Sequence, residues 1–589
     1  MASKKKKSPM IALTNSLLAV LLVSLSVLLG LELYRLNVLS TKLLLPILIG
    51  IVLLDFLFII WLFKRKRKTF SHVICWILTI CLSCGYGWGC YSLIKTGTAL
   101  DFLTANNNKI KNVVSVYVLE DSPITDAAQL SGKTVGVLSN INREGTEKLV
   151  EQLQEKEAAI TTEGYHNFSE LAGALYNGQV EAVAFNDVYL DNILSLEGYS
   201  DFSTRTRKVF EAVYYTENSA SAKKVSNITT EPFTVMLNGS DSRGGLGDVD
   251  RSDVNMLVTI NPVTKVVLLV SIPRDAYVMT VCDPEYECMN GQYDKLTHTG
   301  IHTYNTTKST IENFMNVDIN YTFRANFTAV VDLVDALDGI DVDVAPGYAV
   351  DYFYTNDMFG TDYGVHEGIN HLNGQAALCY ARERYAYLEG DFQRIRNQQE
   401  VLTAIAKKAV SAQGLARYTQ LLDTIQGNFW TDLKQDEITD FIKMQVDQMP
   451  DWKFISYSLS GEPDQMYCAE AYGYAAVVIL DMNTARTAEE LIKAVKNGDS
   501  AEQIEQMIAE SGNEYPDYDY GEGSSQVQSW NSSSEADVNY DDGTYWGYDQ
   551  TTDWVDDGYS DETYDENVWW GEADFPNYDD PGYIPSENE

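Results

Sequence analysis

Residues 233–243, FTVMLNGSDSR, decide the fold of the largest part of this chain. Their first five residues form an apolar run that leads directly into a polar loop. Residues 256–260 and 265–272 are further apolar runs, and the second one ends in Pro-Arg-Asp at 273–275. Open α/β sheets bind ligands where their strands end in polar residues. The pattern therefore predicts an α/β unit with a functional site at one edge of its sheet.

Helices are predicted further along the same unit. Apolar residues recur at helical spacing in residues 328–337 and from 390 to about 410. We place this α/β unit at residues 230–487 and a helical extension at 488–512. A smaller α/β unit, at residues 99–225, precedes it. Short strands alternate with helices there, which predicts a parallel sheet.

The smaller unit contains two further informative stretches. GKTVGV at 132–137 and GQVEAVAFND at 178–187 resemble one lobe of an extracellular solute-binding protein. The unit is about half as long as a two-lobed binder. Two interpretations stay open, namely a module for a small ligand or partner and a scaffold without a ligand.

Three long apolar runs open the chain, at residues 10–34, 43–63 and 70–94. Each reaches the roughly 20 residues that a membrane-spanning helix needs, and three such runs argue against a cleaved signal peptide. Clusters of Lys and Arg at 4–7 and 64–68 flank them, and the positive-inside rule places such clusters in the cytoplasm. Residues 1–95 therefore predict a multi-pass membrane anchor with a cytoplasmic N-terminus and everything beyond Lys95 outside the cell.

Charge is distributed unevenly along the 589 residues. The formal net charge is −41, yet the first 95 residues carry +10 and residues 511–589 carry −22. An acidic chain of this kind excludes nucleic-acid binding through a generally basic surface. The segment at 513–589 is acidic and aromatic, with no Lys or Arg, which predicts a disordered tail. Either a wall-contacting or cation-binding arm or a solvated extension fits that composition.

Cysteine spacing leaves two questions open in the predicted external part. Cys282 and Cys288 flank a short loop and suit a local disulfide. Cys379 and Cys468 are either a second pair or two buried thiols.

Carboxylates and arginines carry the candidate chemistry. Asp241 and Asp253 flank strands, and paired carboxylates on neighbouring loops suit a hard cation such as Mg²⁺. Several arginines near apolar runs are expected to converge, namely Arg274, Arg382, Arg384 and Arg394. Guanidinium forks together with a divalent cation match an oligophosphate. Each arginine alone could belong to a structural ion pair, but burying the whole set without an anion is costly.

Spacing within these motifs supports the same interpretation. Arg382 and Arg384 are two residues apart and share a face if their segment is extended. Arg394 and Gln398 are four apart and share one face of a helix. The sequence contains no Gly-X-Ser-X-Gly elbow, Walker A loop or HExxH helix, so serine hydrolases, P-loop NTPases and zinc proteases lack support.

The stretch from about residue 233 to 407 resembles the catalytic domain of the LytR-CpsA-Psr family. The matching motifs are GSDSR at 239–243, RSD at 251–253, SIPRD at 271–275, LDGIDV at 337–342, LNGQAAL at 372–378 with YARER at 380–384, and GDF-X-R at 390–394 with Gln398. The membrane anchor and the preceding accessory domain also look like this family. The resemblance implies a three-layer α-β-α catalytic domain.

The resemblance further implies a Mg²⁺-dependent phosphotransferase on the outer face of a Gram-positive membrane. Such an enzyme moves a glycopolymer, for example a teichoic acid or capsular polysaccharide, from a polyprenyl-pyrophosphate carrier to peptidoglycan. Asp241 and Asp253 would hold Mg²⁺. The pyrophosphate would be gripped by Arg251, Arg274, Arg382, Arg384, Arg394 and Gln398, with Arg243 and Lys295 as additional contacts.

Two features of the implied mechanism concern single elements. Asp275, which we group with Arg274 as catalytic, would either orient Arg274 or assist proton removal. The polyprenyl tail would lie in an apolar tunnel to which residues 327–337 contribute. Two rival functions remain, a polyprenyl-pyrophosphate phosphatase and a non-enzymatic surface receptor for a wall precursor.

Overall fold

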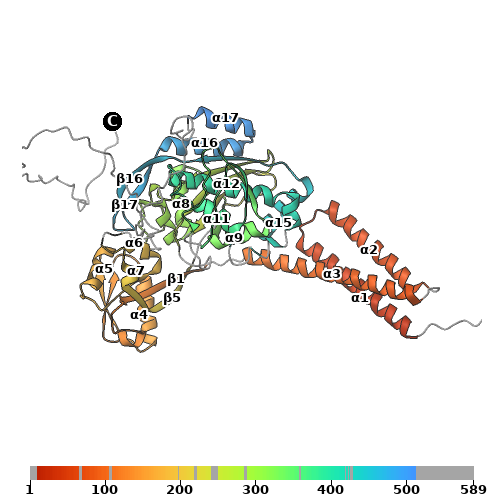
Figure 1. Cartoon of the computed structure of the whole chain (residues 1–589), viewed down its shortest axis with the longest axis horizontal. Helices are drawn as coiled ribbons and strands as arrows, with labels where there is room; N and C mark the ends of the chain where they lie inside the picture. The colour runs from red at the N-terminus through yellow and green to blue at the C-terminus, as the bar shows by residue number, and fades with distance from the viewer. Residues whose placement is uncertain are drawn as a thin grey trace, which may run out of the picture. The chain divides into compact units, whose positions relative to one another are not determined.

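The computed structural model describes most of the chain (Figure 1). The described residues are 9–64, 69–104, 109–194, 196, 198–217, 222–240, 250–283, 288–356, 360–417, 420, 421, 424 and 429–512. The predicted site residues Asp241 and Arg243, and the whole predicted tail at 513–589, lie outside this part.

Three long helices form the N-terminal segment, as predicted. They are α1 (Pro9–Leu36), α2 (Thr41–Phe63) and α3 (Thr69–Thr104). Each is long and apolar enough to cross a membrane. A few polar contacts join them: Asn15 donates to the carbonyl of Leu62 at 2.7 Å, and the Tyr86 hydroxyl donates to Asp55 at 3.2 Å. Polar groups that pair with one another in this way can be buried within an apolar bundle.

The accessory domain contains a five-stranded sheet in the order β3-β2-β4-β1-β5. Its strands are β1 (Lys109–Leu119), β2 (Thr134–Leu138), β3 (Thr161–Tyr165), β4 (Ala182–Asn186) and β5 (Thr206–Glu217). Its helices are α4 (Arg143–Glu155), α5 (Phe168–Tyr176), α6 (Leu190–Leu194) and α7 (Phe202–Arg205). The prediction of a parallel sheet is wrong: β2 is parallel to β3 and β4, but β1 is antiparallel to β4 and β5. The first strand of the domain, β1, and its last strand, β5, pair with each other in antiparallel orientation.

The larger α/β domain, predicted at residues 230–487, is built on a six-stranded mixed sheet in the order β14-β11-β6-β7-β8-β15. The strands are β6 (Phe233–Ser240), β7 (Val254–Asn261), β8 (Val266–Ile272), β11 (Tyr321–Asn326), β14 (Phe429–Thr431) and β15 (Lys453–Ser458). β6 is parallel to β11 and β8 is parallel to β15, while β7 runs antiparallel between β6 and β8. Every residue of β8 is buried. A central strand covered on both faces needs such a continuous apolar run.

Helices cover both faces of this sheet and complete the expected three layers (Figure 1). One face packs on α8 (Tyr304–Met315), α16 (Met482–Asn497) and α17 (Ala501–Glu510) through strand residues such as Leu257 and Leu268. The opposite face carries Met256 and Leu269 and lies toward α9 (Phe327–Ala336), α11 (Gly374–Arg382), α12 (Asp391–Ala409) and α15 (Gln435–Gln448). Successive strand residues therefore serve opposite layers. Helix α16 runs through position 487, where the sequence places the domain boundary.

Three small hairpins complete this domain. They are β9 (Tyr277–Met279) with β10 (Tyr293–Lys295), β12 (Ile340–Val344) with β13 (Gly368–Leu372), and β16 (Gly461–Cys468) with β17 (Gly473–Leu480). A short helix, α13 (Ala412–Ala416), follows α12. Cys282 and Cys288 form a disulfide beyond β9, whereas Cys379 and Cys468 are two separate buried thiols.

Candidate functional site

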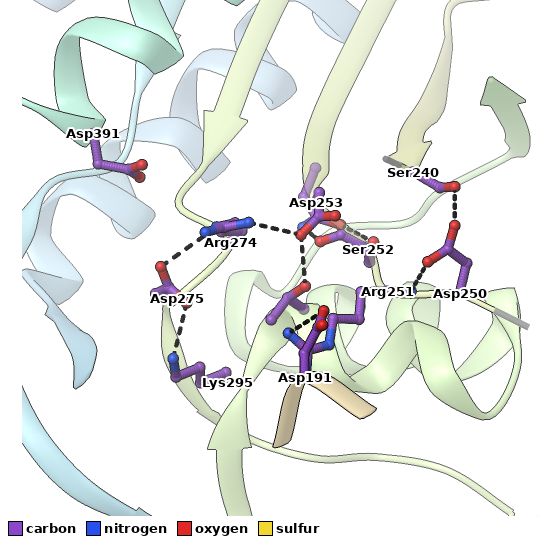
Figure 2. A network of polar contacts seen from close by, with 12 residues as sticks. Asp191, Ser240, Asp250, Arg251, Ser252, Asp253, Arg274, Asp275, Lys295 and Asp391 are labelled. Carbon is purple, nitrogen blue, oxygen red and sulfur yellow. Dashed lines mark hydrogen bonds and ion pairs between the residues drawn. The ribbon is translucent and has the colours of Figure 1, made fainter. Parts of the chain in front are cut away.

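One edge of the six-stranded sheet gathers most of the predicted site residues. Strands β6 and β8 end at this edge and β7 begins there, because β7 is antiparallel to both of them. Asp253 therefore stands immediately before β7, and Arg274 and Asp275 follow β8 and one proline. Figure 2 shows their side chains pointing toward one another from these neighbouring strand ends.

Arg274 lies at the centre of a continuous chain of ion pairs. Its Nη1 is 3.0 Å from Asp253 Oδ1, and its Nε is 3.5 Å from Asp275 Oδ2. The other oxygen of Asp275 is 3.3 Å from Nζ of the buried Lys295. Thr297 also donates to Asp253 Oδ1, at 3.2 Å. The network fixes each charged group in one orientation (Figure 2).

The pKa values of the two carboxyls reflect this pairing. Burial alone would raise the pKa of Asp275, but Lys295 and Arg274 outweigh it and hold that pKa well below its usual value. Burial is likewise outweighed at Asp253 by Arg274, Arg251 and Arg394, so its pKa is lowered. Both side chains are therefore carboxylates at neutral pH.

Arg394 approaches the same cluster from another element, the first turn of α12. It pairs with Asp391 one turn earlier in the helix. Burial, followed by repulsion from Arg274 and Arg384, lowers the pKa of Arg394 to about 10, although Asp391 opposes that shift. The guanidinium groups thus repel one another in the absence of an anion. An anionic ligand would relieve that repulsion, which makes the cluster suited to bind one.

The loop before β7 adds residues that the sequence interpretation did not include. Ser240 donates to Asp250, and Asp250 Oδ1 accepts the backbone N–H of Arg251 at 2.8 Å. Burial raises the pKa of Asp250, even though the buried Arg324 of β11 opposes the shift. Gly300 lies so close that an added Cβ would meet the Ser252 nitrogen at 2.7 Å. The sequence did contain one signal for Arg324: it is the only charged residue in the otherwise largely apolar strand YTFRAN.

Arg251 receives its partners from the accessory domain. Its Nη2 donates to Asn192 Oδ1 at 2.5 Å, and its Nη1 is 3.4 Å from Asp191 Oδ2. Both residues belong to α6, and Figure 2 shows Asp191 beside Arg251. Sequence reasoning missed this contact because no spacing rule connects residues about 60 positions apart in two different domains.

Arg382, Arg384 and Gln398 lie differently from the ion-pair chain. Arg382 is the last residue of α11, and its guanidinium stacks over the Phe327 ring with 4.5 Å to the centroid. Arg384 follows the helix and donates to the Tyr385 hydroxyl at 2.5 Å. The condition under which Arg382 and Arg384 would share a face, an extended segment, is not met at Arg382, because α11 continues through that residue. Gln398 and Arg382 both line a cavity beneath α9 and α12.

This cavity has a volume of about 350 Å³ and lies between the sheet and helices α9, α11, α12 and α15. Its walls are apolar, with side chains such as Val258, Leu269 and Leu333. Among the described residues that line it, four are polar: Asn238, Asn326, Arg382 and Gln398. The two asparagines stand at or near the ends of β6 and β11, and Asn238 donates to Ser252 in the site loop. The polar end of the cavity therefore adjoins the charged sheet edge.

The oxygen donors of the site fit the chemistry of Mg²⁺, which prefers carboxylate and hydroxyl ligands. Asp253 uses one oxygen for Arg274 and Thr297, and a carboxylate offers about four acceptor positions. Among the described residues, no group of three or more His, Cys, Asp or Glu side chains is arranged around a common point. Asp241, the second predicted ligand, lies outside that part of the chain.

Fold and site together define a class of protein: an α/β domain with a basic, carboxylate-lined edge beside an apolar cavity, preceded by three helices long and apolar enough to cross a membrane. The chain belongs to the LytR_cpsA_psr family, whose model matches residues 202–488. It is 34% identical over 253 residues to the polyisoprenyl-teichoic acid–peptidoglycan teichoic acid transferase TagU of Bacillus anthracis, covering 42% of this chain and 76% of that relative. The TagU of Enterococcus faecalis is 30% identical over 273 residues, covering 44% and 83%. A solved structure described as TagT bound to LIIa-WTA is 26% identical, covers 48% of this chain and 97% of that one, and has a TM-score of 0.37.

Proposed function

We propose that this protein is an extracellular, membrane-anchored phosphotransferase. It transfers a glycopolymer from a polyprenyl-pyrophosphate carrier to a hydroxyl of peptidoglycan. One observation carries the proposal: the polar end of an apolar cavity of about 350 Å³ adjoins a cluster of converging arginines. This arrangement fits an amphiphile with an anionic head and a hydrocarbon tail. The names of the TagU relatives likewise describe a polyisoprenyl-linked teichoic acid as the donor and peptidoglycan as the acceptor.

In the proposed reaction an acceptor hydroxyl oxygen attacks the phosphorus that carries the glycopolymer. A new P–O bond forms, the bond to the bridging oxygen breaks, and polyprenyl monophosphate leaves with the hydroxyl proton. Arg274 and Arg394 neutralise the charge that develops on the transferred group and fix its position. Arg251, Arg384 and Lys295 contact the outer phosphate oxygens, and Arg243 belongs to the same set.

Asp275 acts in this proposal as a positioning residue. Its pKa is held well below its usual value by Lys295 and Arg274, so it is a weak base and a poor acceptor for the hydroxyl proton. Its two oxygens instead orient Arg274 and Lys295, at 3.5 and 3.3 Å. Mg²⁺, held by Asp253 and Asp241, would supply further neutralisation of the pyrophosphate.

Arg382 and Gln398 take the junction between head and tail. Both are polar residues in the lining of the cavity, and Arg382 also stacks on Phe327. The polyprenyl chain would then extend between α9 and the sheet. The Lys-rich segments at 4–7 and 64–68 favour the cytoplasm, and together with an odd number of candidate spans they support a position of this cavity outside the cell.

The test uses the full chain in lipid nanodiscs, with a polyprenyl-pyrophosphate-linked glycan, Mg²⁺ and glycan strands from peptidoglycan. Mass spectrometry looks for glycan joined to the acceptor through one phosphate, beside an Arg274→Ala control and a chelator control. A joined product that disappears in the Arg274→Ala variant supports the proposal. Free phosphorylated glycan alone would identify a phosphatase, and tight donor binding without turnover would identify a receptor.

A further inference from the structure

Four tyrosines from two small hairpins gather beside the charged edge of the sheet. We name this group the tyrosine platform; it consists of Tyr277, Tyr293, Tyr467 and Tyr474. The rings of Tyr277 and Tyr293 lie 5.2 Å apart between centroids, and those of Tyr467 and Tyr474 lie 5.8 Å apart. The first pair comes from β9 and β10, and the second pair comes from β16 and β17.

Hydrogen bonds join the two hairpins into one surface. The Tyr277 hydroxyl donates to the carbonyl of Tyr467 at 2.8 Å, and the Ala469 N–H donates to the carbonyl of Tyr293 at 3.3 Å. At the far side of the hairpin the Val478 N–H donates to the carbonyl of Asp275 at 2.8 Å. The platform is therefore held in a fixed arrangement rather than formed by independent loops.

Buried polar contacts also anchor the turn between β16 and β17. Glu470 accepts a hydrogen bond from the Tyr189 hydroxyl at 3.2 Å and lies 3.0 Å from His302 Nε2. Its own N–H donates to Asp294, next to Lys295. A preorganised surface loses little conformational entropy when a ligand binds.

Three of the four tyrosines of the platform are largely exposed to solvent. Tyr293, Tyr467 and Tyr474 keep 53%, 45% and 76% of their surface accessible. Contiguous exposed aromatic side chains on a folded domain mark an interaction site. Tyrosine combines a flat apolar ring with a polar tip, so it favours ligands that have both kinds of surface.

The platform starts at the proposed reaction centre. Tyr277 follows Asp275 by two residues, and in the β9–β10 ladder it stands directly opposite Lys295. Opposed residues of an antiparallel pair project from the same face. Lys295 in turn contacts Asp275 at 3.3 Å. The aromatic surface and the ion-pair chain are thus continuous.

We propose that the tyrosine platform binds sugar rings of the acceptor glycan, an inference that rests on the proposed function. The acceptor hydroxyl must reach a phosphorus beside Arg274, so the neighbouring sugar units must lie on the adjoining surface. Pyranose rings present apolar C–H faces surrounded by hydroxyls, which complement stacked tyrosine rings and their phenol groups. The platform has no charged side chain of its own, which suits an uncharged sugar backbone better than the anionic donor.

Binding of glycan strands is measured separately from transfer, with the full chain in nanodiscs and soluble, uncrosslinked peptidoglycan glycan strands as the probe. The Tyr293→Ala and Tyr474→Ala variants are each expected to weaken the Kd about fivefold to tenfold, as loss of one aromatic contact does. Tyr293→Phe and Tyr474→Phe keep the ring and are expected to retain most of the affinity. Tyr215→Ala removes a similarly exposed ring, 59% accessible, from the accessory domain and serves as the matched control.

Kinetics give the second readout. In the alanine variants the KM for acceptor is expected to rise about fivefold to tenfold, while the KM for donor and the kcat at saturating acceptor stay within twofold. The Tm of each variant should equal that of the wild type, because the replaced side chains are largely exposed.

Three outcomes overturn the inference. The first is an unchanged glycan Kd in the Tyr293→Ala/Tyr474→Ala double variant. The second is an equal loss of glycan affinity in Tyr215→Ala. The third is that the platform variants lose binding to empty lipid vesicles and keep their binding to glycan. Failure of the proposed function is distinguishable. If the wild type transfers nothing but its glycan binding still depends on the four tyrosines, the platform stands as a glycan site and the transferase does not. Arg274→Ala is expected to slow transfer about 100-fold to 1000-fold and to leave glycan binding intact.

Discussion

The charged sheet edge and the apolar cavity use the same strands in opposite ways. At the edge, Asp253, Arg274 and Asp275 flank β7 and β8, and ion pairs of 3.0 to 3.5 Å tie them to one another and to Lys295 of β10. In the cavity, neighbouring positions of the same strands present only side chains such as Val258 and Leu269. At the edge, each charged residue has a particular partner. In the cavity, only the size and the apolar character of the side chains matter.

This contrast predicts different sensitivities to substitution. Removal of one member of the ion-pair chain leaves its partners buried and unpaired, which is costly for folding and for ligand binding. Replacement of one cavity residue by another apolar residue changes the space available to a ligand and leaves the charges untouched. The predictions below use that difference.

The largest effect is expected for Arg274→Ala. Breaking a buried ion pair costs about 3–5 kcal/mol of stability, because Asp253 and Asp275 lose their common cation. Loss of one group that stabilises transition-state charge lowers kcat about 100-fold to 1000-fold. Thermal unfolding and single-turnover transfer measure the two effects. Arg274→Lys, the matched control, restores most of the stability but less of the activity, since a lysine lacks the guanidinium fork. Transfer within threefold of wild type in the alanine variant would contradict a central role for Arg274.

Filling the cavity comes second. Val330→Trp, on α9, is expected to weaken binding of a long polyprenyl donor about 15-fold, since displacing two methylene groups costs about 1.6 kcal/mol. A donor with a short prenyl chain should be affected less than threefold, and inorganic pyrophosphate not at all. Val330→Ala leaves the space open and serves as the control. Equal losses for long and short donors would show that the tail does not occupy this cavity.

The sequence predicted the fold of the larger domain because its elements are locally strong. The apolar strands at 233–237 and 265–272, the helix from 390 and the three apolar runs near the N-terminus all have the expected periods and lengths. It also placed Asp253, Arg274 and Asp275 at strand ends, where the structure has them, but it did not predict the ion pair between Asp253 and Arg274. The position of a residue at the end of a strand is fixed by the position of that strand in the sheet.

What the sequence did not predict depends on contacts between distant segments. The mixed sheet of the accessory domain arises from pairing of its first and last strands, which no local pattern encodes. The partners of Arg251 come from α6, and the tyrosine platform needs two hairpins almost 200 residues apart. The position of Arg382 at the end of α11 also depends on a contact of this kind, because the Glu383 carboxylate accepts the N–H groups that follow the helix.

Acid sensitivity should follow the charged edge. The folded-state pKa values of Asp253 and Asp275 are lowered, so their contribution to stability is complete above the usual aspartate pKa of about 3.9 and is lost as pH falls below it. The Tm is therefore expected to decrease between about pH 4 and pH 2, with a loss of about 1.4 kcal/mol for each pKa unit. Asp275→Asn should flatten this decrease. The exposed Asp451→Asn should leave it unchanged, and an identical slope in all three proteins would exclude the buried carboxylates as its source.

The smallest effect is expected where the charged edge depends on another domain. Asp191→Ala and Asn192→Ala remove the two partners of Arg251, but the Asp191 side chain is 60% exposed, so solvent screens the pair and its worth is below about 1 kcal/mol. A twofold to fivefold rise in the KM for donor, with kcat unchanged, is the expected result. Glu151→Ala breaks an exposed ion pair with Lys148 elsewhere in the accessory domain and is the matched control. If the two α6 variants match this control, Arg251 is positioned by Asp250 and its own loop alone. If they instead lower kcat as strongly as Arg274→Ala, the accessory domain is part of the reaction centre and the contrast between edge and cavity extends across both domains.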